Sequence, residues 1–80
     1  MKTIRVYYYA ALREQSGLGE EAVQTSASSP EDLYGELALR HGFQLHAHQL
    51  KVAVNDDFCD WRTILRDGDR VVFVPPVAGG

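Results

Sequence analysis

The last strand-like segment of the chain runs from Arg70 to Val74 and is apolar on both of its faces. In a strand, Val71 and Phe73 point to one side. Arg70, Val72 and Val74 point to the other side. A strand that is apolar on both sides is usually covered on both sides. A chain of 80 residues with a single long helix can cover only one side. The second face is therefore either a surface for a partner protein or part of a central strand that loops shield.

Alternation of apolar and polar side chains predicts four further strands. The first is the clearest, because Ile4, Val6 and Tyr8 share one face. The predicted strands cover residues 2–9, 20–26, 50–54 and 58–61, and the second returns antiparallel to the first. Asn55-Asp56-Asp57 predicts the turn between the third and fourth strands, and Asp67-Gly68-Asp69 predicts a tight turn before the last one.

Two helices are predicted, one short and one long. Residues 10–16 favour a short helix that ends at Gly17. The longer helix begins after Ser29, which is a good N-cap, and has Pro30 at its first position with carboxylates in the first turn. It ends at Gly42, after two basic residues.

The order of these elements indicates the fold class. The chain is predicted to form a hairpin, then a long helix, then further strands, which is the order of an α+β protein. This order predicts one mixed sheet with the main helix packed on one face. Eighty residues make a single domain. We expect residues 1–74 to form this domain and residues 75–80 to form a C-terminal tail.

Composition and charge narrow the function classes. The apolar share of 45% is normal for a globular protein. No apolar run approaches the roughly 18 residues that span a bilayer, and the N-terminal segment lacks the apolar core of a signal peptide. We therefore expect a cytoplasmic protein that does not bind membranes. The net charge of −3 argues against nucleic acid as a partner.

Side chains within the chain do not form a recognisable active site. His41, His46 and His48 are close in sequence, but the segment around them lacks the cysteines and carboxylates of a metal site, so none is predicted. Cys59 is the only cysteine, which excludes an internal disulfide and a four-thiolate iron–sulfur cluster. We expect it to pack as a small hydrophobic residue.

The tail, Pro75-Pro76-Val77-Ala78-Gly79-Gly80, offers a different kind of reactive group. Its prolines stiffen the exit from the sheet, and its glycines carry no side chain. Fully extended, six residues reach roughly 20 Å, which is comparable to the depth of an enzyme cleft. Such a tip can enter a site too narrow for any residue with a Cβ. By elimination, the carboxylate of Gly80 is the candidate for chemistry.

A carboxylate is a poor electrophile at neutral pH and must be activated before a nucleophile attacks it. Adenylation by a separate enzyme does this by forming an acyl-phosphate anhydride with AMP. Attack by a sulfur donor then leaves a thiocarboxylate, which is anionic and itself nucleophilic. Attack by a thiol or an amine instead gives a thioester or an amide. The tail is compatible with each of these products.

Four segments along the chain match the pattern of one known family. They are Val6-Tyr7-Tyr8-Tyr9-Ala10, Leu12-Arg13-Glu14 followed by Gly17, Val52-Ala53-Val54-Asn55, and the whole end of the chain from Asp67 to Gly80. In these segments the chain resembles the small sulfur-carrier subunits of molybdopterin synthase, which are ubiquitin-like β-grasp proteins. The Asp-Gly-Asp turn, the apolar strand and the Pro-Pro-Val-x-Gly-Gly end are the specific part of the likeness. Arg70 departs from it, since many relatives are acidic there.

The resemblance implies a β-grasp fold with a flexible Gly-Gly tail and a role in sulfur transfer. Gly80 would be adenylated by an E1-like activating enzyme, which uses ATP, and converted to a thiocarboxylate. The chain itself would bind no cofactor. The tail would insert into the large subunit of molybdopterin synthase, a heterotetramer of two large and two small subunits. There it would donate sulfur to cyclic pyranopterin monophosphate to form the dithiolene of molybdopterin.

The same resemblance implies a role for each residue near the end of the chain. Gly80 would bear the sulfur, and Gly79 would give steric access. Phe73 would support the interface with the partner. The partner's channel would be filled by Pro75, Pro76, Val77 and Ala78. Such a subunit is a carrier that supplies a reagent, whereas the catalytic pocket belongs to its partner.

Three other functions remain compatible with the sequence. The chain could carry sulfur for another pathway, such as thiamine synthesis or tRNA thiolation. A ubiquitin-like modifier would use the same tail to form amide links to lysines. In the third alternative, the chain is an interaction module whose Gly-Gly end is incidental.

Overall fold

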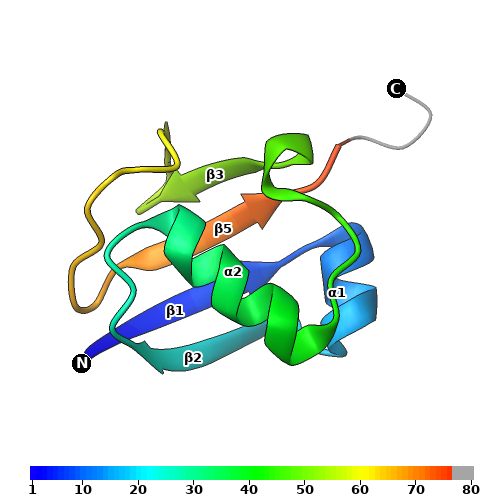
Figure 1. The fold of residues 1–80 in the computed structure, drawn as a ribbon, viewed down its shortest axis with the longest axis horizontal. Coiled ribbons are helices and arrows are strands. Elements are labelled where there is room, and N and C mark those ends of the chain that lie inside the picture. Colours follow the sequence, from blue (N-terminus) through cyan, green and yellow to red (C-terminus); the bar gives the residue numbers. More distant parts are fainter. Residues whose placement is uncertain (77–80) are drawn as a thin grey trace.

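The computed structural model describes residues 1–76 of the chain. Within this range the chain forms a five-stranded sheet with the order β2-β1-β5-β3-β4, and its helices pack against it (Figure 1). The elements are β1 (Lys2–Tyr8), α1 (Ala10–Ser16), β2 (Glu20–Thr25), α2 (Pro30–His41), the 3₁₀ helix η1 (Ala47–Gln49), β3 (Lys51–Val54), β4 (Asp57–Cys59) and β5 (Arg70–Val74). β1 and β5 are parallel and the other pairs are antiparallel. The predicted α+β class, with a mixed sheet and the main helix on one face, is confirmed.

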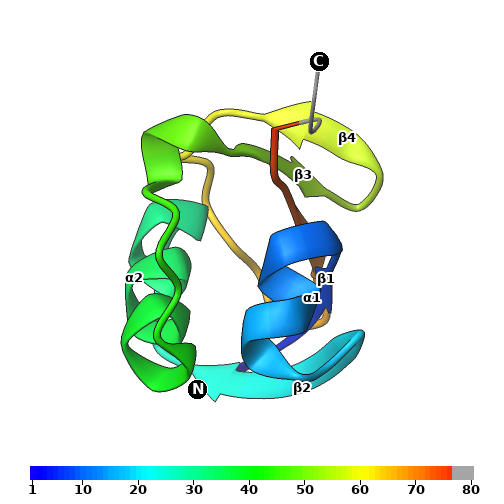
Figure 2. The same cartoon turned by 90° about the vertical axis from the view of Figure 1, so that its right-hand side faces the viewer.

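The core lies between the sheet and α2. The inward faces of β1 and β5 supply its centre, because Ile4, Val6, Val71 and Phe73 have no exposed surface. Figure 2 shows the strands curving around α2, with α1 at the end of the sheet from which the C-terminal segment leaves. α1 adds Leu12, which is also fully buried. The remaining members of the cluster are Tyr8, Val23, Ala27, Leu33, Tyr34, Leu37, Leu50, Val52 and Leu65.

Local signals set the ends of both α-helices as the sequence predicts. The hydroxyl oxygen of Ser29 accepts a hydrogen bond of 3.2 Å from the backbone N–H of Asp32, which satisfies one of the free donors at the start of α2. Gly17 and Gly42 follow the last residues of α1 and α2 with φ values of 75° and 70°. This left-handed conformation is the one that favours glycine over other residues.

The β3–β4 hairpin differs from the sequence prediction. Asn55 and Asp56 both have positive φ, 52° and 74°, as in a type I′ turn of two central residues. Asp57 therefore pairs with Val54, so β4 begins one residue earlier than predicted. The predicted strand over 58–61 was also wrong at its end, because the chain leaves the sheet after Cys59 and Trp61 packs inward.

No helix within residues 1–76 is long and apolar enough to cross a membrane.

The predicted strands over 2–9 and 20–26 each end one residue earlier than expected, and the predicted strand over 50–54 begins one residue later. The connection between α2 and β3 contains η1.

The N-cap of α2 gives a direct test of this fold. We expect Ser29→Ala to lower the free energy of unfolding by about 1 kcal/mol, because the N–H of Asp32 loses its side-chain acceptor. The matched control is Ser28→Ala, one residue before the cap, which should change stability by less than about 0.5 kcal/mol. Urea unfolding followed by circular dichroism measures both. Equal losses in the two variants would contradict the assignment of the cap.

Candidate functional site

The C-terminal tail leaves from the central strand of the sheet. β5 pairs with β1 on one side and with β3 on the other, and its last residue, Val74, pairs with Lys51 of β3. Pro75 follows and is buried, whereas Pro76 is exposed. We call residues 74–76 the stem. Its position is set by the core of the domain and not by a surface loop.

The candidate site residues of the tail divide into two groups. Pro75 and Pro76 lie in the stem. Outside the described residues lie Val77, Ala78, Gly79 and Gly80. Their predicted roles, including the thiocarboxylate on Gly80, therefore stay predictions.

Phe73 lies on the helix side of β5 and has no exposed surface. Its ring packs edge-on against Tyr34, with 5.1 Å between ring centroids, and stacks on Trp61 at 5.7 Å. In this structure it offers no surface for direct contact with a partner. Its predicted support of an interface stays a prediction, and the structure restricts it to an indirect form in which Phe73 anchors the strand that bears the stem.

Two grooves flank the stem. On the α1 side, the groove is lined by Tyr9, Ala10, Ala11, Glu14 and Leu45 together with the stem. On the other side, the groove is lined by His48, Gln49, Leu50, Lys51 and Phe58 together with the stem. Tyr9 and Phe58 are unusually exposed for aromatic residues, at 52% and 70%. Around the tail's point of exit, the surface therefore combines apolar rings with charged side chains.

We call five of these residues the collar: Tyr9 and Glu14 on the α1 side, and His48, Lys51 and Phe58 on the other. The prediction from sequence missed all five as site residues. Glu14 entered the sequence analysis only through the family resemblance, and the strand that carries Phe58 was too short for its outward face to be recognised. The available signal was that Tyr9 directly precedes the predicted short helix and that Phe58 directly follows the predicted turn Asn55-Asp56-Asp57.

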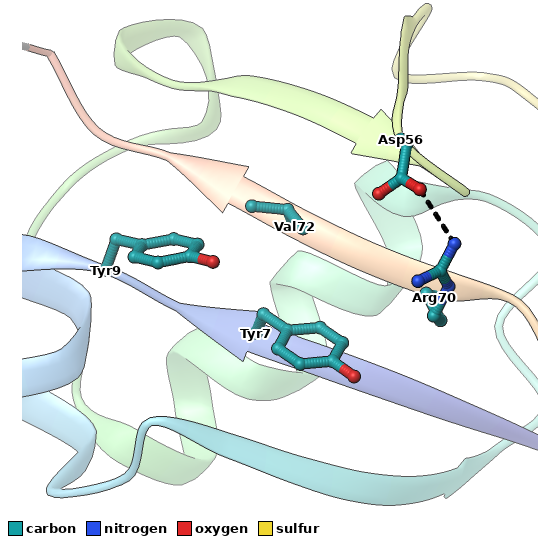
Figure 3. Close-up of a pocket in the computed structure, with 5 residues that line it drawn as sticks. All are labelled: Tyr7, Tyr9, Asp56, Arg70 and Val72. Carbon is teal, nitrogen blue, oxygen red and sulfur yellow. Dashed lines mark hydrogen bonds and ion pairs between the residues drawn. The ribbon is translucent and has the colours of Figure 1, made fainter.

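The sheet face opposite α2 carries an apolar row. Residues that pair across the strands share a face, and these pairs place Phe58, Ala53, Val72 and Tyr7 in one line over β4, β3, β5 and β1. Figure 3 shows Tyr7 and Val72 on this face, with Tyr9 nearer the stem. β5 is central, as one of the two alternatives predicts, and Val72 is half-buried on this face. The other alternative, a surface for a partner protein, stays a prediction.

An ion pair borders this row. The guanidinium of Arg70 lies 2.8 Å from the carboxylate of Asp56, and Figure 3 shows the pair beside Tyr7. Both side chains are well exposed, at 49% and 77%. Exposed pairs of this kind contribute little to stability. The pair places one positive and one negative side chain at the border of the sheet face opposite α2.

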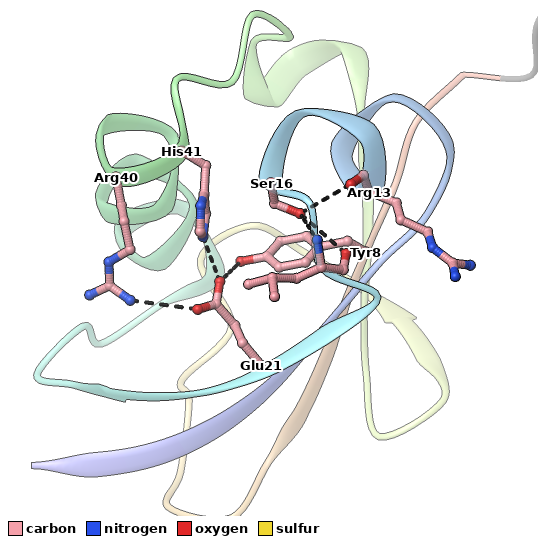
Figure 4. A network of polar contacts seen from close by, with 7 residues as sticks. Tyr8, Arg13, Ser16, Glu21, Arg40 and His41 are labelled. Carbon is pink, nitrogen blue, oxygen red and sulfur yellow. Dashed lines mark hydrogen bonds and ion pairs between the residues drawn. The ribbon is translucent and has the colours of Figure 1, made fainter.

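A second polar cluster lies on the helix side, between β2 and α2 (Figure 4). One oxygen of the Glu21 carboxylate accepts a hydrogen bond from the Tyr8 hydroxyl at 2.5 Å and lies 2.6 Å from Nε2 of His41. Arg40 lies 3.8 Å from the other oxygen. Among residues 1–76, no buried side-chain nitrogen or oxygen lacks a hydrogen-bond partner. The cluster therefore joins β1, β2 and α2 and has no unsatisfied group awaiting a substrate.

These contacts shift two pKa values. Burial raises the pKa of the Glu21 carboxyl, but hydrogen bonds from Tyr8 and His41 and the positive charges of His41 and Arg40 outweigh it and hold the pKa below its ordinary value. Burial, followed by the hydrogen bond to Glu21, raises the pKa of the Tyr8 hydroxyl well above its usual range. Tyr8 is therefore a neutral donor to an ionised acceptor over the whole range around neutral pH.

The histidines and the cysteine have separate surroundings. His41 contacts Glu21, whereas the rings of His46 and His48 stack on each other with 5.6 Å between centroids. Within residues 1–76, no set of three or more His, Cys, Asp or Glu side chains is grouped as metal ligands would be. Cys59 is half-buried and packs against the core cluster, as the sequence predicts for a small hydrophobic residue.

The five-stranded mixed sheet with the main helix on one face is a ubiquitin-like β-grasp fold. Comparisons with known proteins identify the family within this class. Residues 6–80 match the ThiS family. The chain is 31% identical over 83 residues to the molybdopterin synthase sulfur carrier subunit of Mycobacterium tuberculosis, with all of both chains covered. It is 35% identical over 82 residues to that of Escherichia coli, covering 96% of this chain and 99% of the other. The chain belongs to this family of sulfur carriers.

Solved structures confirm the fold. A Pyrococcus furiosus protein described as molybdopterin converting factor subunit 1 superposes with a TM-score of 0.82 at 29% identity, covering 96% of this chain and 100% of that one. Small archaeal modifier protein 1 from Haloferax volcanii gives 0.80 at 18% identity, with the same coverage. The complex of subunits 1 and 2 of the molybdopterin-converting factor from Helicobacter pylori contains a chain that gives 0.68 at 24% identity, with 98% and 99% covered. The last two likenesses concern the fold alone.

The Glu21 cluster predicts a dependence of stability on pH. A carboxyl whose pKa is lowered by folding stabilises the protein above its ordinary pKa of 4.5, and this contribution is lost as the pH falls through the lower value of the folded state. We expect Glu21→Gln to lower the free energy of unfolding by about 1–3 kcal/mol at neutral pH. The difference from the unsubstituted protein should shrink as the pH falls below 4.5 and through the lower pKa of the folded state.

The matched control for this prediction is Glu20→Gln. Glu20 is 53% exposed and forms a surface pair with Arg5, so its loss should change stability by at most about 1 kcal/mol. Urea unfolding at a series of pH values measures all three proteins. An equal difference between Glu21→Gln and the unsubstituted protein at acid and neutral pH would contradict the role assigned to the carboxylate.

Proposed function

We propose that this chain is the sulfur-carrier subunit of molybdopterin synthase. The observation that carries the proposal is the full-length match to curated sulfur carrier subunits, in a family match that includes the Gly-Gly end. The structure adds physical support, because a tail with no side chain at its tip begins at the central strand of the sheet, which is paired on both sides. A carrier needs this combination of a stable base and a thin reactive end.

The chemistry begins at the carboxylate of Gly80. In an activating enzyme of the E1 type, this carboxylate attacks the α-phosphorus of ATP, which forms the acyl adenylate and releases pyrophosphate. Hydrosulfide, or a donor at the same oxidation level, then attacks the carbonyl carbon. AMP leaves with the bridging oxygen, and the product is a thiocarboxylate. The chain contributes the carboxylate and a shape that fits, whereas the activating enzyme binds ATP. No cofactor resident in this chain is needed.

The thiocarboxylate then transfers its sulfur within the large subunit of the synthase, where cyclic pyranopterin monophosphate is bound. We propose an assembly of two large and two small subunits, and a cytoplasmic location in which ATP is available to the activating enzyme. The complex of subunits 1 and 2 in Helicobacter pylori supports a large-subunit partner. The exposed rings of Tyr9 and Phe58 beside the stem are suited to meet such a partner.

The first test is the intact mass of the chain after incubation with ATP, sulfide and its cognate activating enzyme. We expect a gain equal to the exchange of one oxygen for one sulfur, and no gain in a variant that lacks Gly80. If an activating enzyme of proven activity produces no gain, the carrier function is rejected. Covalent adducts on lysines of other proteins would instead establish a modifier.

The recipient is tested separately with the loaded carrier. Addition of the large subunit and cyclic pyranopterin monophosphate should yield molybdopterin and return the chain to its original mass. If a large subunit that is active with another carrier gives no product, the chain serves a different sulfur-transfer pathway.

Steric access at the tip predicts a graded loss. We expect Gly79→Val to fold normally but to reduce thiocarboxylate formation by about 100-fold, because a branched Cβ displaces the carboxylate from its position for attack. Gly79→Ala should give an intermediate loss. The control is Gly35→Ala on α2, where an added Cβ meets no atom within 4 Å and loading should be unchanged. Normal loading of Gly79→Val would contradict a narrow channel.

A further inference from the structure

The two sides of the stem carry opposite charge, and we propose that this polarity fixes the rotation of the tail in the large subunit. The large subunit would present a basic group beside Glu14 and an acidic group beside Lys51. An apolar side chain next to the basic group would fill the α1-side groove. This inference rests on the proposed function and names the surface through which the same partner is recognised.

The α1 side of the stem is apolar with an acidic rim. Its groove has a volume of about 710 Å³ and lies between α1, Leu45 and the stem. The carboxylate of Glu14 is its charged lining group. The neighbouring Arg13 does not neutralise it, because the guanidinium of Arg13 lies beside Gly19, on another side of α1, and Figure 4 shows it directed away from the helix.

The opposite side is apolar with a basic rim. Its groove, of about 430 Å³, places Phe58 and Leu50 next to the stem, with the ammonium group of Lys51 and the imidazole of His48 at its edge. Lys51 is exposed and pairs in the sheet with Val74, the first residue of the stem. The two rims therefore lie on either side of the same short segment.

The length of the tail makes contact with the collar necessary. In the proposed function the reactive carboxylate belongs to Gly80, which lies four residues beyond the stem, and four residues reach at most roughly 13 Å when extended. A partner that brings the last residue into a closed site must therefore approach the stem itself and cover the surface around it. Tyr9 and Phe58, at 52% and 70% exposure, lie in that covered zone.

Charge is what distinguishes one rotation of the stem from another. The glycines at the tip have no side chains that could define an orientation, and each groove offers one aromatic ring. The grooves differ in volume and in the sign of their charged side chain. Half a turn would place Glu14 beside the acidic group of the large subunit and Lys51 beside its basic group. Like charges across an interface disfavour the wrong arrangement and thereby set its register.

The experiment measures binding of the cognate large subunit to charge-exchanged variants. We expect Glu14→Lys and Lys51→Glu each to weaken binding by about tenfold at low salt, with a smaller effect at high salt. The double variant Glu14→Lys/Lys51→Glu keeps the net charge at −3 but reverses the polarity of the collar. It should bind at least as weakly as either single variant.

The matched control is the double variant Glu31→Lys/Arg62→Glu. It also keeps the net charge, but its residues lie at the start of α2 and in the segment after β4, at the other end of the molecule from the stem (Figure 1). Its binding should be unchanged. If the collar variant and this control bind equally well, the proposal is overturned, because net charge and not its arrangement would then govern recognition.

A second measurement tests the apolar part of the surface. Phe58→Ala should weaken binding by about tenfold or more, as expected for a large side chain at the centre of an interface. The control is Leu39→Ala, which removes a side chain that is 90% exposed on α2, outside the collar. Equal binding by the two variants would overturn the placement of the collar at the interface.

Thiocarboxylate formation, measured by intact mass on the same variants, separates the possible failures. Normal loading with weakened binding to the large subunit supports the proposal. Reduced loading with normal binding would overturn it and assign the collar to the activating enzyme. If the unsubstituted chain neither loads nor binds, the proposed function has failed, which is a different result from failure of the collar alone.

Discussion

The pairing of β5 between β1 and β3 is the contact on which the rest of the molecule depends. It joins the first strand of the chain to the last, in parallel register from Arg5 with Arg70 to Tyr8 with Phe73. The paired strands carry the fully buried side chains at the centre of the core. Burial of a ring such as Phe73 contributes about 1.5–3 kcal/mol. The tail therefore starts from the part of the chain that the core restrains most strongly.

This arrangement separates stability from function by position. The apolar side chains that face α2 are buried, and within residues 1–76 every buried side-chain nitrogen or oxygen has a hydrogen-bond partner. The cluster around Glu21 joins β2 to the C-terminal end of α2. At the stem, by contrast, the chain exposes rings and charges that contribute little to folding. Substitutions at the collar and substitutions in the core are therefore expected to have separable effects.

Local signals in the sequence were sufficient for most of the fold, whereas contacts between distant segments were not. Ser29, Gly17 and Gly42 act through neighbouring residues, so the helix ends could be predicted, and the alternation in β1 identified its buried face. The β3–β4 turn was misjudged by one residue, because the sequence does not show that both Asn55 and Asp56 adopt positive φ.

The collar could not be predicted for a similar reason. Tyr9 and Glu14 come from the segment around α1, and Lys51 and Phe58 come from the β3–β4 hairpin. The two segments lie on either side of the stem only because the sheet has the order β1-β5-β3-β4. Phe73 illustrates a related limit. The resemblance implies that it supports the interface, but the alternation of β5 turns its side chain into the core, so this predicted support is indirect. Nearness to the tail in sequence and nearness on the surface are different properties here.

The energetics of docking explain why a carrier needs both a stem and a collar. Confining one residue's backbone costs about 1–2 kcal/mol, so each residue that the free chain already holds in place lowers the cost of insertion. Pro75 is such a residue, because its ring fixes φ and its side chain is already buried against the domain. The glycines of the tip add little apolar contact of their own. Tyr9 and Phe58 are 52% and 70% exposed, so burial of each contributes about half to two thirds of the roughly 1.5–3 kcal/mol of a fully exposed ring. Together they offset the confinement of one or two tail residues. The narrow tip can therefore be selected for chemical access alone, while the surface around its base supplies the affinity.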